Sequence, residues 1–405
     1  MTGPKSNRTL TGAQQGRAGT HPDGMAGLPA RALNRRSIMS DLANVSALTT
    51  TPTQLPLSWY FDPRIAELEK RTLFDEGPGY VGHELLVPNT GDYFTLDWLG
   101  SGKALVRGED GVHLLGNVCR HRQSLLLQGR GNTRNIVCPI HRWTYDLRGK
   151  LLGAPEFPDN PCLDLPRDTL QNWNGLLFAG KRDVAADLAD FSLLEDYDFT
   201  GHILERVEVT EYDFNWKAFM EVYLELYHVA PFHAGLGKFV DPSVYRWDFG
   251  HRWSVQEMGI YQQLEKPGSA AYGNYIEALL RYTNGAMPKY GTVWSCYYPN
   301  VMLEWYPFCQ VISTVHPRGA EKCVNVVEFY YPEEVAGFER ELVELHRQAY
   351  MESAIEDGQI CTLMHKGRRA LYEAGVEQHG PYHSPSEDGM IHFHEYLRRH
   401  LEPHL

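Results

Sequence analysis

The sequence lacks three features that would each assign it to a common class of protein. No stretch approaches the ~18 uninterrupted apolar residues of a membrane-spanning helix. The 38 Lys and Arg residues are outnumbered by 51 Asp and Glu residues, and the net charge of −13 argues against a nucleic-acid binder, which would present a basic face. Seven cysteines, an odd number in a long chain without a recognisable signal peptide, do not predict a disulfide framework. A reducing cytoplasm, with thiols free to bind metal, is the better interpretation.

The length and composition are typical of a globular protein with two domains and an N-terminal extension. The chain has 405 residues, of which 43% are hydrophobic and 12% aromatic, and these fractions exclude wholesale disorder. Residues 1–55 are expected to be a disordered leader and linker, because the first 40 residues carry six Lys and Arg residues against one Asp and show little apolar periodicity. A transit peptide, a flexible tail or a start codon assigned upstream of Met39 would each explain such a leader.

The remaining sequence predicts an α+β protein in three parts. Residues 56–80 predict an N-terminal helix, with a start signal at Asp62-Pro63. Residues 81–190 contain short runs of alternating apolar residues separated by Gly, Asn and Asp, which is the pattern of an all-β domain. Residues 191–405 mix strand and helix patterns, and they predict an antiparallel sheet covered by helices.

Two cysteine–histidine pairs form the first candidate metal site. Cys119 and His121 have the spacing C-x-H, and Cys138 and His141 have the spacing C-x-x-H. Four such ligands on two loops suit either a structural zinc ion or an iron–sulfur cluster. Because each pair contains one Cys and one His, the pattern favours a cluster with two thiolates on one iron and two imidazoles on the other.

Two histidines and a carboxylate form the second candidate site. His228 and His233 are five residues apart, so a continuous helix would separate their side chains by about 140°. Pro231 predicts that the helix ends near Tyr227–Val229, which frees both rings to converge on one metal. A facial triad also needs one carboxylate. The candidates are Glu221, Glu225, and Glu356 or Asp357 on a long helix predicted over 332–374. Of these, Glu225 is better placed to hydrogen-bond His228 than to bind the metal.

Residues of about 55–400 resemble the α subunit of Rieske non-haem iron oxygenases. The segments NVCRHR and CPIHRWTYDLRGKL are similar to the two cluster-binding loops of that family, and WNGLLFAG resembles the strand that closes the same domain. IEDGQIC resembles the segment that supplies the third iron ligand. The resemblance implies a [2Fe–2S] cluster on Cys119, His121, Cys138 and His141. It also implies a mononuclear Fe(II) on His228, His233 and Asp357, with Glu356 as the alternative to Asp357.

The resemblance further implies a homotrimer in which electrons cross between subunits. Glu225 would bridge His228 and His141 of the neighbouring subunit, and Asn215, in the motif NWK, is a further catalytic candidate. The chain departs from the usual family pattern at three positions: Glu225 stands where most members have Asp, and Gln123 and Arg142 stand where Gly is common.

The activity implied by the resemblance is that of a terminal oxygenase, acting as a monooxygenase or a dioxygenase on a small molecule with O₂. Electrons would come from a separate NAD(P)H-dependent flavin or ferredoxin-type reductase, since the chain lacks a G-x-G-x-x-G motif. The glutamate bridge and the segment GTVWSCYYPNVMLEWYPF are most similar to the branch that acts on quaternary ammonium compounds such as glycine betaine, stachydrine and carnitine, which implies N-demethylation.

The same segment supplies many aromatic faces, which attract methylammonium groups. They belong to Trp294, Tyr297, Tyr298, Trp305, Tyr306 and Phe308. Aromatic residues on strands also pack cores, and they would equally suit a flat aromatic substrate, so ring hydroxylation is the alternative activity. A zinc-stabilised binding protein is the alternative of a different class.

Overall fold

The computed structural model describes residues 54–100, 102–193, 197–260, 268–288 and 291–405. The predicted leader, residues 1–55, lies outside the described residues except for its last two. Leu55 is buried in the core rather than disordered. Among the described helices, none is long and apolar enough to cross a membrane.

Pro63 marks a break in the first helical segment. It contains α1 (Ser58–Phe61), α2 (Pro63–Glu69) and a π-helical turn at Lys70–Phe74. Asp62 adopts an extended conformation before Pro63, and its carboxylate accepts a hydrogen bond from the Arg64 N–H at 2.8 Å. The helix start predicted at Asp62-Pro63 is therefore present, but an additional short helix precedes it.

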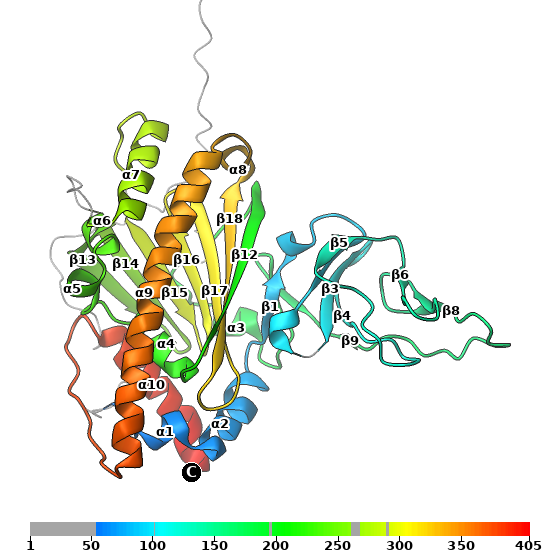
Figure 1. Cartoon of the computed structure of the whole chain (residues 1–405), viewed down its shortest axis with the longest axis horizontal. Helices are drawn as coiled ribbons and strands as arrows, with labels where there is room; N and C mark the ends of the chain where they lie inside the picture. The colour runs from blue at the N-terminus through cyan, green and yellow to red at the C-terminus, as the bar shows by residue number, and fades with distance from the viewer. Residues whose placement is uncertain (1–53, 101, 194–196, 261–267, 289–290) are drawn as a thin grey trace, which may run out of the picture. The chain divides into compact units, whose positions relative to one another are not determined.

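The part of the chain that follows is all-β, as predicted, and consists of three small sheets (Figure 1). The first has the order β1 (Tyr80–His83), β11 (Leu176–Phe178), β10 (Gln171–Trp173). The second has the order β5 (Arg130–Asn132), β2 (Asp92–Thr95), β3 (Lys103–Gly108), β4 (Gly111–Gly116), β9 (Arg167–Asp168). The third has the order β6 (Ile136–Val137), β7 (Thr144–Tyr145), β8 (Leu151–Gly153). Short 3₁₀ turns occupy Glu84–Leu86 and Asp97–Leu99, and α3 spans Val184–Asp187.

The C-terminal part is built on one antiparallel sheet of seven strands. Their order is β12 (His202–Tyr212), β18 (Cys323–Pro332), β17 (Cys309–Pro317), β16 (Val301–Tyr306), β15 (Thr292–Tyr297), β14 (Trp253–Ile260), β13 (Val240–Phe249). The central strands are buried along almost their whole length, which explains their nearly continuous apolar sequences.

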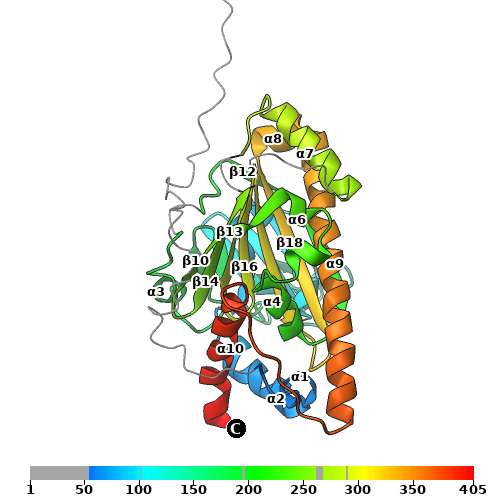
Figure 2. The ribbon, with the colours of Figure 1, turned by 90° about the vertical axis from the view of Figure 1, so that its left-hand side faces the viewer.

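Helices cover one face of this sheet: Figure 1 shows α9 in front of the strands, and Figure 2, turned by 90°, shows α4 and α6 in front of them. They are α4 (Trp216–Tyr223), α5 (Val229–Phe232), α6 (Leu236–Phe239), α7 (Ala270–Tyr282), α8 (Glu333–Phe338), α9 (Arg340–Glu373) and α10 (Asp388–Leu401), followed by a 3₁₀ turn at Glu402–His404. The predicted α+β class, an antiparallel sheet covered by helices behind an all-β domain, is confirmed.

Two predicted helix boundaries are wrong. The helix expected to end at Tyr227–Val229 ends at Tyr223, and Pro231 lies inside α5 instead of after a helix. Pro231 is tolerated there because the first-turn N–H groups of a helix have no intrahelical partner. The long helix predicted over 332–374 is interrupted at Glu339, which separates α8 from α9.

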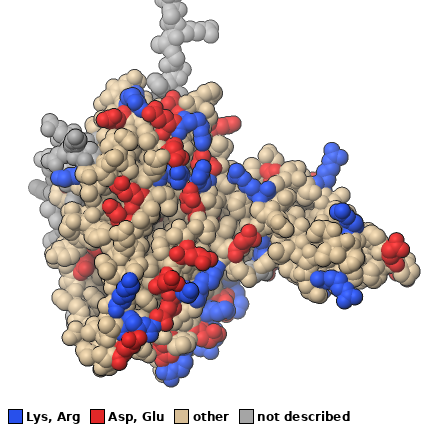
Figure 3. All heavy atoms as spheres, in the orientation of Figure 1, with Lys and Arg blue, Asp and Glu red and all other residues tan. Residues whose placement is uncertain are grey.

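The face of the molecule in Figure 3 carries acidic and basic side chains in close mixture. Ion pairs join α9 to β12: Arg347 lies 3.1 Å from Glu208, and Arg340 lies 2.9 Å from Glu205.

Candidate metal centres and active site

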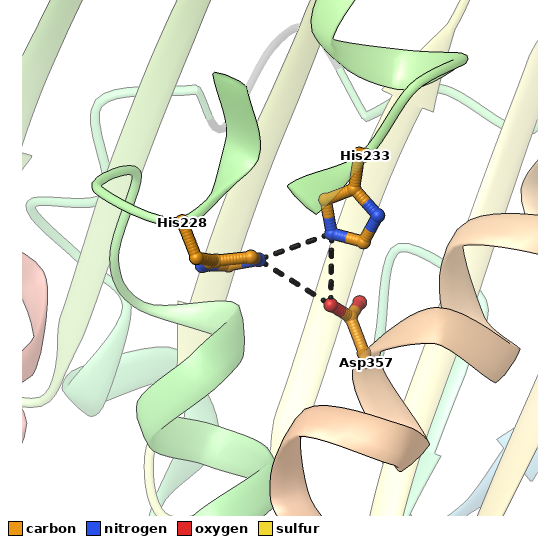
Figure 4. A group of neighbouring side chains, drawn as sticks. All are labelled: His228, His233 and Asp357. Atoms are coloured by element: carbon orange, nitrogen blue, oxygen red, sulfur yellow. Dashed lines mark hydrogen bonds and ion pairs between the residues drawn. The ribbon is translucent and has the colours of Figure 1, made fainter. Parts of the chain in front are cut away.

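Three side chains predicted from the sequence converge beside the sheet. His228 and His233 lie immediately before and after the single turn of α5, and Asp357 lies in the middle of α9 (Figure 4). The two His Nε2 atoms are 3.1 Å apart. The Asp357 Oδ1 atom lies 3.0 Å from Nε2 of His233 and 3.4 Å from Nε2 of His228. One turn of helix, rather than the end of a long one, therefore brings the two rings together.

This triangle has the dimensions of one face of a metal's coordination shell. Two ligands at about 2.1 Å from a metal and about 90° apart lie about 3 Å from each other. The three ligand atoms of His228, His233 and Asp357 all lie within 4.8 Å of one another. Two imidazoles and one carboxylate are the donor set of non-haem Fe(II) sites that keep positions open for other ligands. The residues therefore fit a mononuclear iron.

Each histidine is oriented by a second carboxylate on its other ring nitrogen. Nδ1 of His228 is hydrogen-bonded to Glu225, whose carboxylate also accepts from the His228 backbone N–H at 3.1 Å. Nδ1 of His233 lies 2.6 Å from Glu356. These bonds direct both Nε2 atoms toward Asp357. Burial acts to lower the pKa of His228, but its bonds with Asp357 and Glu225 raise that pKa to about 9.

The neighbouring acids Glu356 and Asp357 thus contact different nitrogen atoms of the histidines. Asp357 faces the Nε2 atoms of both histidines, whereas Glu356 contacts Nδ1 of His233, on the other side of that ring. The geometry favours Asp357 over Glu356 as the third ligand. Glu221, another candidate from the sequence, lies elsewhere: it pairs with Arg368 at 2.7 Å and with His394 at 3.0 Å in a buried cluster.

The triangle opens into a cavity between the sheet and α9. The cavity and its mouth, which is open to solvent, together contain about 670 Å³ of empty space. The lining residues are Phe219, Val222, Tyr223, Glu225, His228, Val229, His233, Leu236, Tyr272, Trp294, Glu304, Tyr306, Ser313, Asn325, Tyr350, Ser353, Ala354 and Asp357.

Only part of the predicted aromatic wall faces this cavity. Trp294 and Tyr306 line it. Tyr297 instead donates a hydrogen bond to Asp187 at 2.6 Å, and the Tyr298 hydroxyl lies 2.8 Å from His392. Tyr297 is three residues from Trp294 on β15, so the alternation of side chains places it on the opposite face of the sheet, and Tyr298 lies beyond the end of that strand.

Other cavity residues were missed by the sequence reasoning. Tyr350 and Ser353 precede Asp357 by seven and four residues on α9, a spacing that places all three on one helix face. Glu304 is an acid in the otherwise apolar strand VMLEWY. A buried charge in such a strand is itself a signal that could have identified it.

The two cysteine–histidine pairs also come together, on two loops with the same backbone geometry. In each loop the cysteine carbonyl accepts from the N–H four residues later, Gln123 in one and Arg142 in the other, at 3.1 Å in both. Both of these residues have a left-handed conformation, with φ of 53° and 59°. The loops therefore keep the backbone that glycine favours at these positions, although neither has glycine there.

The ligand side chains of these loops are suited to a buried cluster with an exposed edge. Cys119 and Cys138 are buried, and the His121 and His141 rings lie 4.7 Å apart between centroids. Within the described part of the chain, His121 Nδ1 is buried and has no hydrogen-bond partner, as expected of an atom that binds a metal. His141 is exposed. Two thiolates and two imidazoles at adjacent loop tips fit a [2Fe–2S] cluster.

Asn215, the further catalytic candidate from the sequence, lies at the start of α4. It caps the N-terminus of α4, where its side-chain oxygen accepts from the Lys217 N–H at 2.9 Å. Its amide nitrogen donates to the carbonyl of Tyr60 at 3.1 Å and to that of Ala320 at 2.6 Å. With its side chain fully used in these bonds, Asn215 stabilises the start of the helix that precedes His228.

Comparison with known proteins agrees with both candidate centres. Residues 79–168 match the Rieske [2Fe-2S] domain, and residues 195–403 match the ring hydroxylating alpha subunit (catalytic domain). The chain belongs to the Rieske oxygenase α-subunit family. The resemblance inferred from the motifs is confirmed, as are an oxygenase activity and the pair of cofactors, a Rieske cluster and a mononuclear iron.

Curated relatives of this chain include two putrescine 2-hydroxylases and a carnitine monooxygenase. A putrescine 2-hydroxylase of Ralstonia nicotianae is 57% identical over 89% of this chain and 99% of its own length. A putrescine 2-hydroxylase of Bordetella bronchiseptica is 47% identical over 91% and 89%. The carnitine monooxygenase oxygenase subunit of Escherichia coli is 25% identical over 85% and 92%.

Solved structures share the fold. A quaternary ammonium Rieske monooxygenase in complex with L-carnitine has a TM-score of 0.68 at 21% identity, covering 86% of this chain and 96% of that one. Naphthalene 1,2-dioxygenase from Rhodococcus sp. has a TM-score of 0.66 at 18% identity, covering 87% and 95%. Oxygenases of this family use O₂, an organic substrate and a separate electron-transfer partner, and they are typically multimeric.

Proposed function

We propose that this chain is the terminal oxygenase that hydroxylates a carbon of a small aliphatic amine, with putrescine as the first candidate substrate. The observation that carries the proposal is the His228–His233–Asp357 triangle, which opens into a small cavity with a buried carboxylate in its wall. Support comes from the two relatives named putrescine 2-hydroxylase, which match nearly the whole chain at 57% and 47% identity.

N-demethylation of a quaternary ammonium compound, the activity predicted from the sequence, is the second candidate. It is supported by Trp294 and Tyr306 in the cavity wall, because a methylammonium group is attracted to aromatic faces. Relatives named for choline and carnitine oxidation are only 25–28% identical, which ranks this candidate below amine hydroxylation. Ring hydroxylation of an arene lacks a comparable relative among these and ranks third.

In the proposed enzyme, His228, His233 and Asp357 hold the iron, and Cys119, His121, Cys138 and His141 hold the cluster. The cluster supplies single electrons, and the iron supplies O₂ activation. Glu225 and Glu356 keep the two imidazoles in the orientation that presents Nε2 to the iron. The apolar and aromatic cavity walls exclude bulk water from the reacting substrate.

We further propose that the working unit is a homotrimer in which electrons pass from His141 of one subunit through Glu225 to His228 of the next. Support comes from exposed apolar side chains at both ends of this route. Ile140, beside His141, is 56% exposed, and Tyr227, beside His228, is 62% exposed. Exposed apolar groups of this size favour burial against a partner.

The electron donor is proposed to be a separate flavin or ferredoxin-type reductase. A reducing, cytoplasmic setting would suit the two cysteine ligands, which bind iron as thiolates.

The test is turnover of candidate substrates by the iron-loaded enzyme with a generic reductase and NADH. Amine hydroxylation predicts NADH and O₂ consumption dependent on putrescine and a product heavier by one oxygen atom in mass spectrometry. Formaldehyde release from carnitine or glycine betaine, without turnover of putrescine, would replace the proposal by N-demethylation. A colourless protein containing zinc, without the reddish-brown absorbance of a Rieske cluster, would favour the non-enzymatic alternative.

A further inference from the structure

One carboxylate in the cavity wall takes no part in the metal triangle. Glu304 lies on β16 and lines the cavity together with Tyr306, two residues further along the same strand face. Only 2% of Glu304 is exposed to solvent. Its register partner on β15 is Trp294, which lines the same cavity.

Two tyrosines hold this carboxylate in place. The Tyr350 hydroxyl donates to Glu304 Oε1 at 3.0 Å, and the Tyr306 hydroxyl donates to Oε2 at 2.8 Å. The Tyr306 oxygen in turn accepts from the Trp294 indole N–H at 2.9 Å. Since each carboxylate oxygen can accept more than one hydrogen bond, both oxygens keep capacity for a further donor from the cavity.

Among the residues that the structure describes, the carboxylate of Glu304 has no protein counter-charge. In the described ranges, no Lys, Arg or His side chain forms an ion pair with Glu304, whereas the buried acids Glu221 and Glu69 pair with Arg368 and Lys217. Burial raises the pKa of Glu304 to about 7, although the hydrogen bonds from Tyr306 and Tyr350 act to lower it. A buried carboxylate without a cation is unfavourable, and a cation delivered by a ligand would relieve that cost.

We propose that Glu304 binds an ammonium group of the substrate and thereby selects primary amines over quaternary ones. This inference rests on the proposed amine hydroxylation and names the residue that recognises the amine. Tyr306, Tyr350 and Trp294 surround the same position with aromatic rings, which attract a cation independently of hydrogen bonding.

The hydrogen bonds distinguish the two kinds of ammonium. A primary ammonium has three N–H donors and can bind both free acceptor positions of Glu304. A trimethylammonium group has no donor, and its methyl groups keep the positive charge away from the carboxylate oxygens. A quaternary ammonium would therefore gain only the weaker charge attraction over the longer distance and would leave the acceptor positions of Glu304 without a hydrogen bond.

The chain offers a matched control for this carboxylate. Glu328 on β18 is also buried, also accepts from two tyrosines, Tyr80 at 2.9 Å and Tyr330, and also has its pKa raised by burial to about 7. Glu328 is three residues from the cavity residue Asn325, on the opposite face of the sheet. A change at Glu328 reproduces the loss of a buried carboxylate without touching the cavity.

The experiment is calorimetric titration of iron-loaded enzyme, without reductase, with putrescine and with 1,4-butanediol, which replaces both ammonium groups by hydroxyls. For the native enzyme we expect putrescine to bind roughly 10- to 100-fold more tightly than the diol. Glu304→Gln should reduce this preference to a few-fold, and Glu328→Gln should leave it unchanged. Choline should bind the native enzyme more weakly than putrescine.

An unchanged preference in Glu304→Gln would overturn the inference while leaving amine hydroxylation in place. A native enzyme that binds and turns over no primary amine would overturn the proposed function and, with it, this inference. If Glu304→Gln loses the cluster absorbance, the experiment uses Glu304→Asp instead. Aspartate keeps the negative charge but places it one methylene further from the ligand. Glu304→Asp should weaken putrescine binding more than diol binding, and equal weakening of both contradicts the proposal.

Discussion

At the scale of single side chains, four acids near the two histidines have four different environments. Asp357 faces both Nε2 atoms, Glu356 and Glu225 each hold one Nδ1, and Glu304 faces the substrate cavity. We thus propose that a carboxylate here acts as a ligand, an orienting group or a cation receptor according to the nitrogen or space that it faces.

The change Glu225→Ala is expected to leave both metals bound and to slow turnover by at least roughly 100-fold, because an orienting and electron-bridging carboxylate is lost. The measurement is substrate-dependent NADH consumption, together with metal content and the Rieske spectrum. Chemical reduction of the cluster should proceed as in the native enzyme, while its reoxidation in the presence of O₂ and substrate slows. Normal turnover would show that Glu225 is not the bridge.

A second prediction concerns the Tyr145 hydroxyl, which lies 3.7 Å from Sγ of Cys119. Hydrogen bonds to cluster sulfurs stabilise the reduced, more negative form, so Tyr145→Phe should lower the reduction potential by roughly tens of millivolts. Potentiometric titration of the cluster absorbance measures the shift. Tyr80→Phe, a buried tyrosine bonded to Glu328, is the matched control and should leave the potential unchanged.

Metal ligands that lie close together in the sequence were predictable from their spacing. The choice between neighbouring residues that point in different directions was not. The spacing within C-x-H and C-x-x-H is short enough for both ligands of a pair to share a loop, so the sequence alone indicated the cluster site. Glu356 and Asp357 differ by about 100° on a helix, and only the packing of α9 decides which one faces the histidines. Glu304 required knowledge of which strand face borders the cavity.

At the scale of elements, two helices position the three metal-facing residues. Asp357 lies on α9, and His228 and His233 flank the single turn of α5. The sequence predicted that Pro231 would end a helix, but the proline fits within the first turn of α5, and this turn determines the spacing of the two rings. The tendency of proline to end a helix is only a preference, and here α5 forms around Pro231 with Val229 packed into the core.

The third prediction follows from the two acids on α9. Asp357→Ala should remove the mononuclear iron, because it deletes a ligand, while Glu356→Ala should keep the iron but weaken its binding by roughly 10- to 100-fold, because it deletes only an orienting bond. Iron per chain after dialysis against a chelator measures both effects. Both variants should keep the Rieske spectrum, and the reverse order of iron loss would exchange the two roles.

At the scale of the whole molecule, the sequence reveals the division into an all-β part and an α+β part but not the strand order. In the seven-stranded sheet β12 lies next to β18, more than 100 residues later in the chain. Such long-range pairing depends on how complete sheets bury their faces, and no local pattern encodes it.

The fourth prediction tests assembly. Ile140→Asp places a charge beside His141, at the proposed subunit contact, and should dissociate the oligomer and abolish substrate-dependent turnover while both metal centres remain. Light scattering after gel filtration reports the mass. Leu363→Asp on α9, where the native side chain is 66% exposed, is the control and should leave mass and activity unchanged. An intact oligomer in Ile140→Asp would place the contact elsewhere.

The position of Tyr350 and Asp357 on one uninterrupted helix has a mechanical consequence. Seven residues separate them, about 10.5 Å along the axis, or two turns. Tyr350 touches the carboxylate proposed to receive the amine, and Asp357 faces the two histidines. A helix moves nearly as a rigid rod over this distance. A ligand that shifts the α9 backbone at Tyr350 would therefore also shift Asp357 relative to the two histidines.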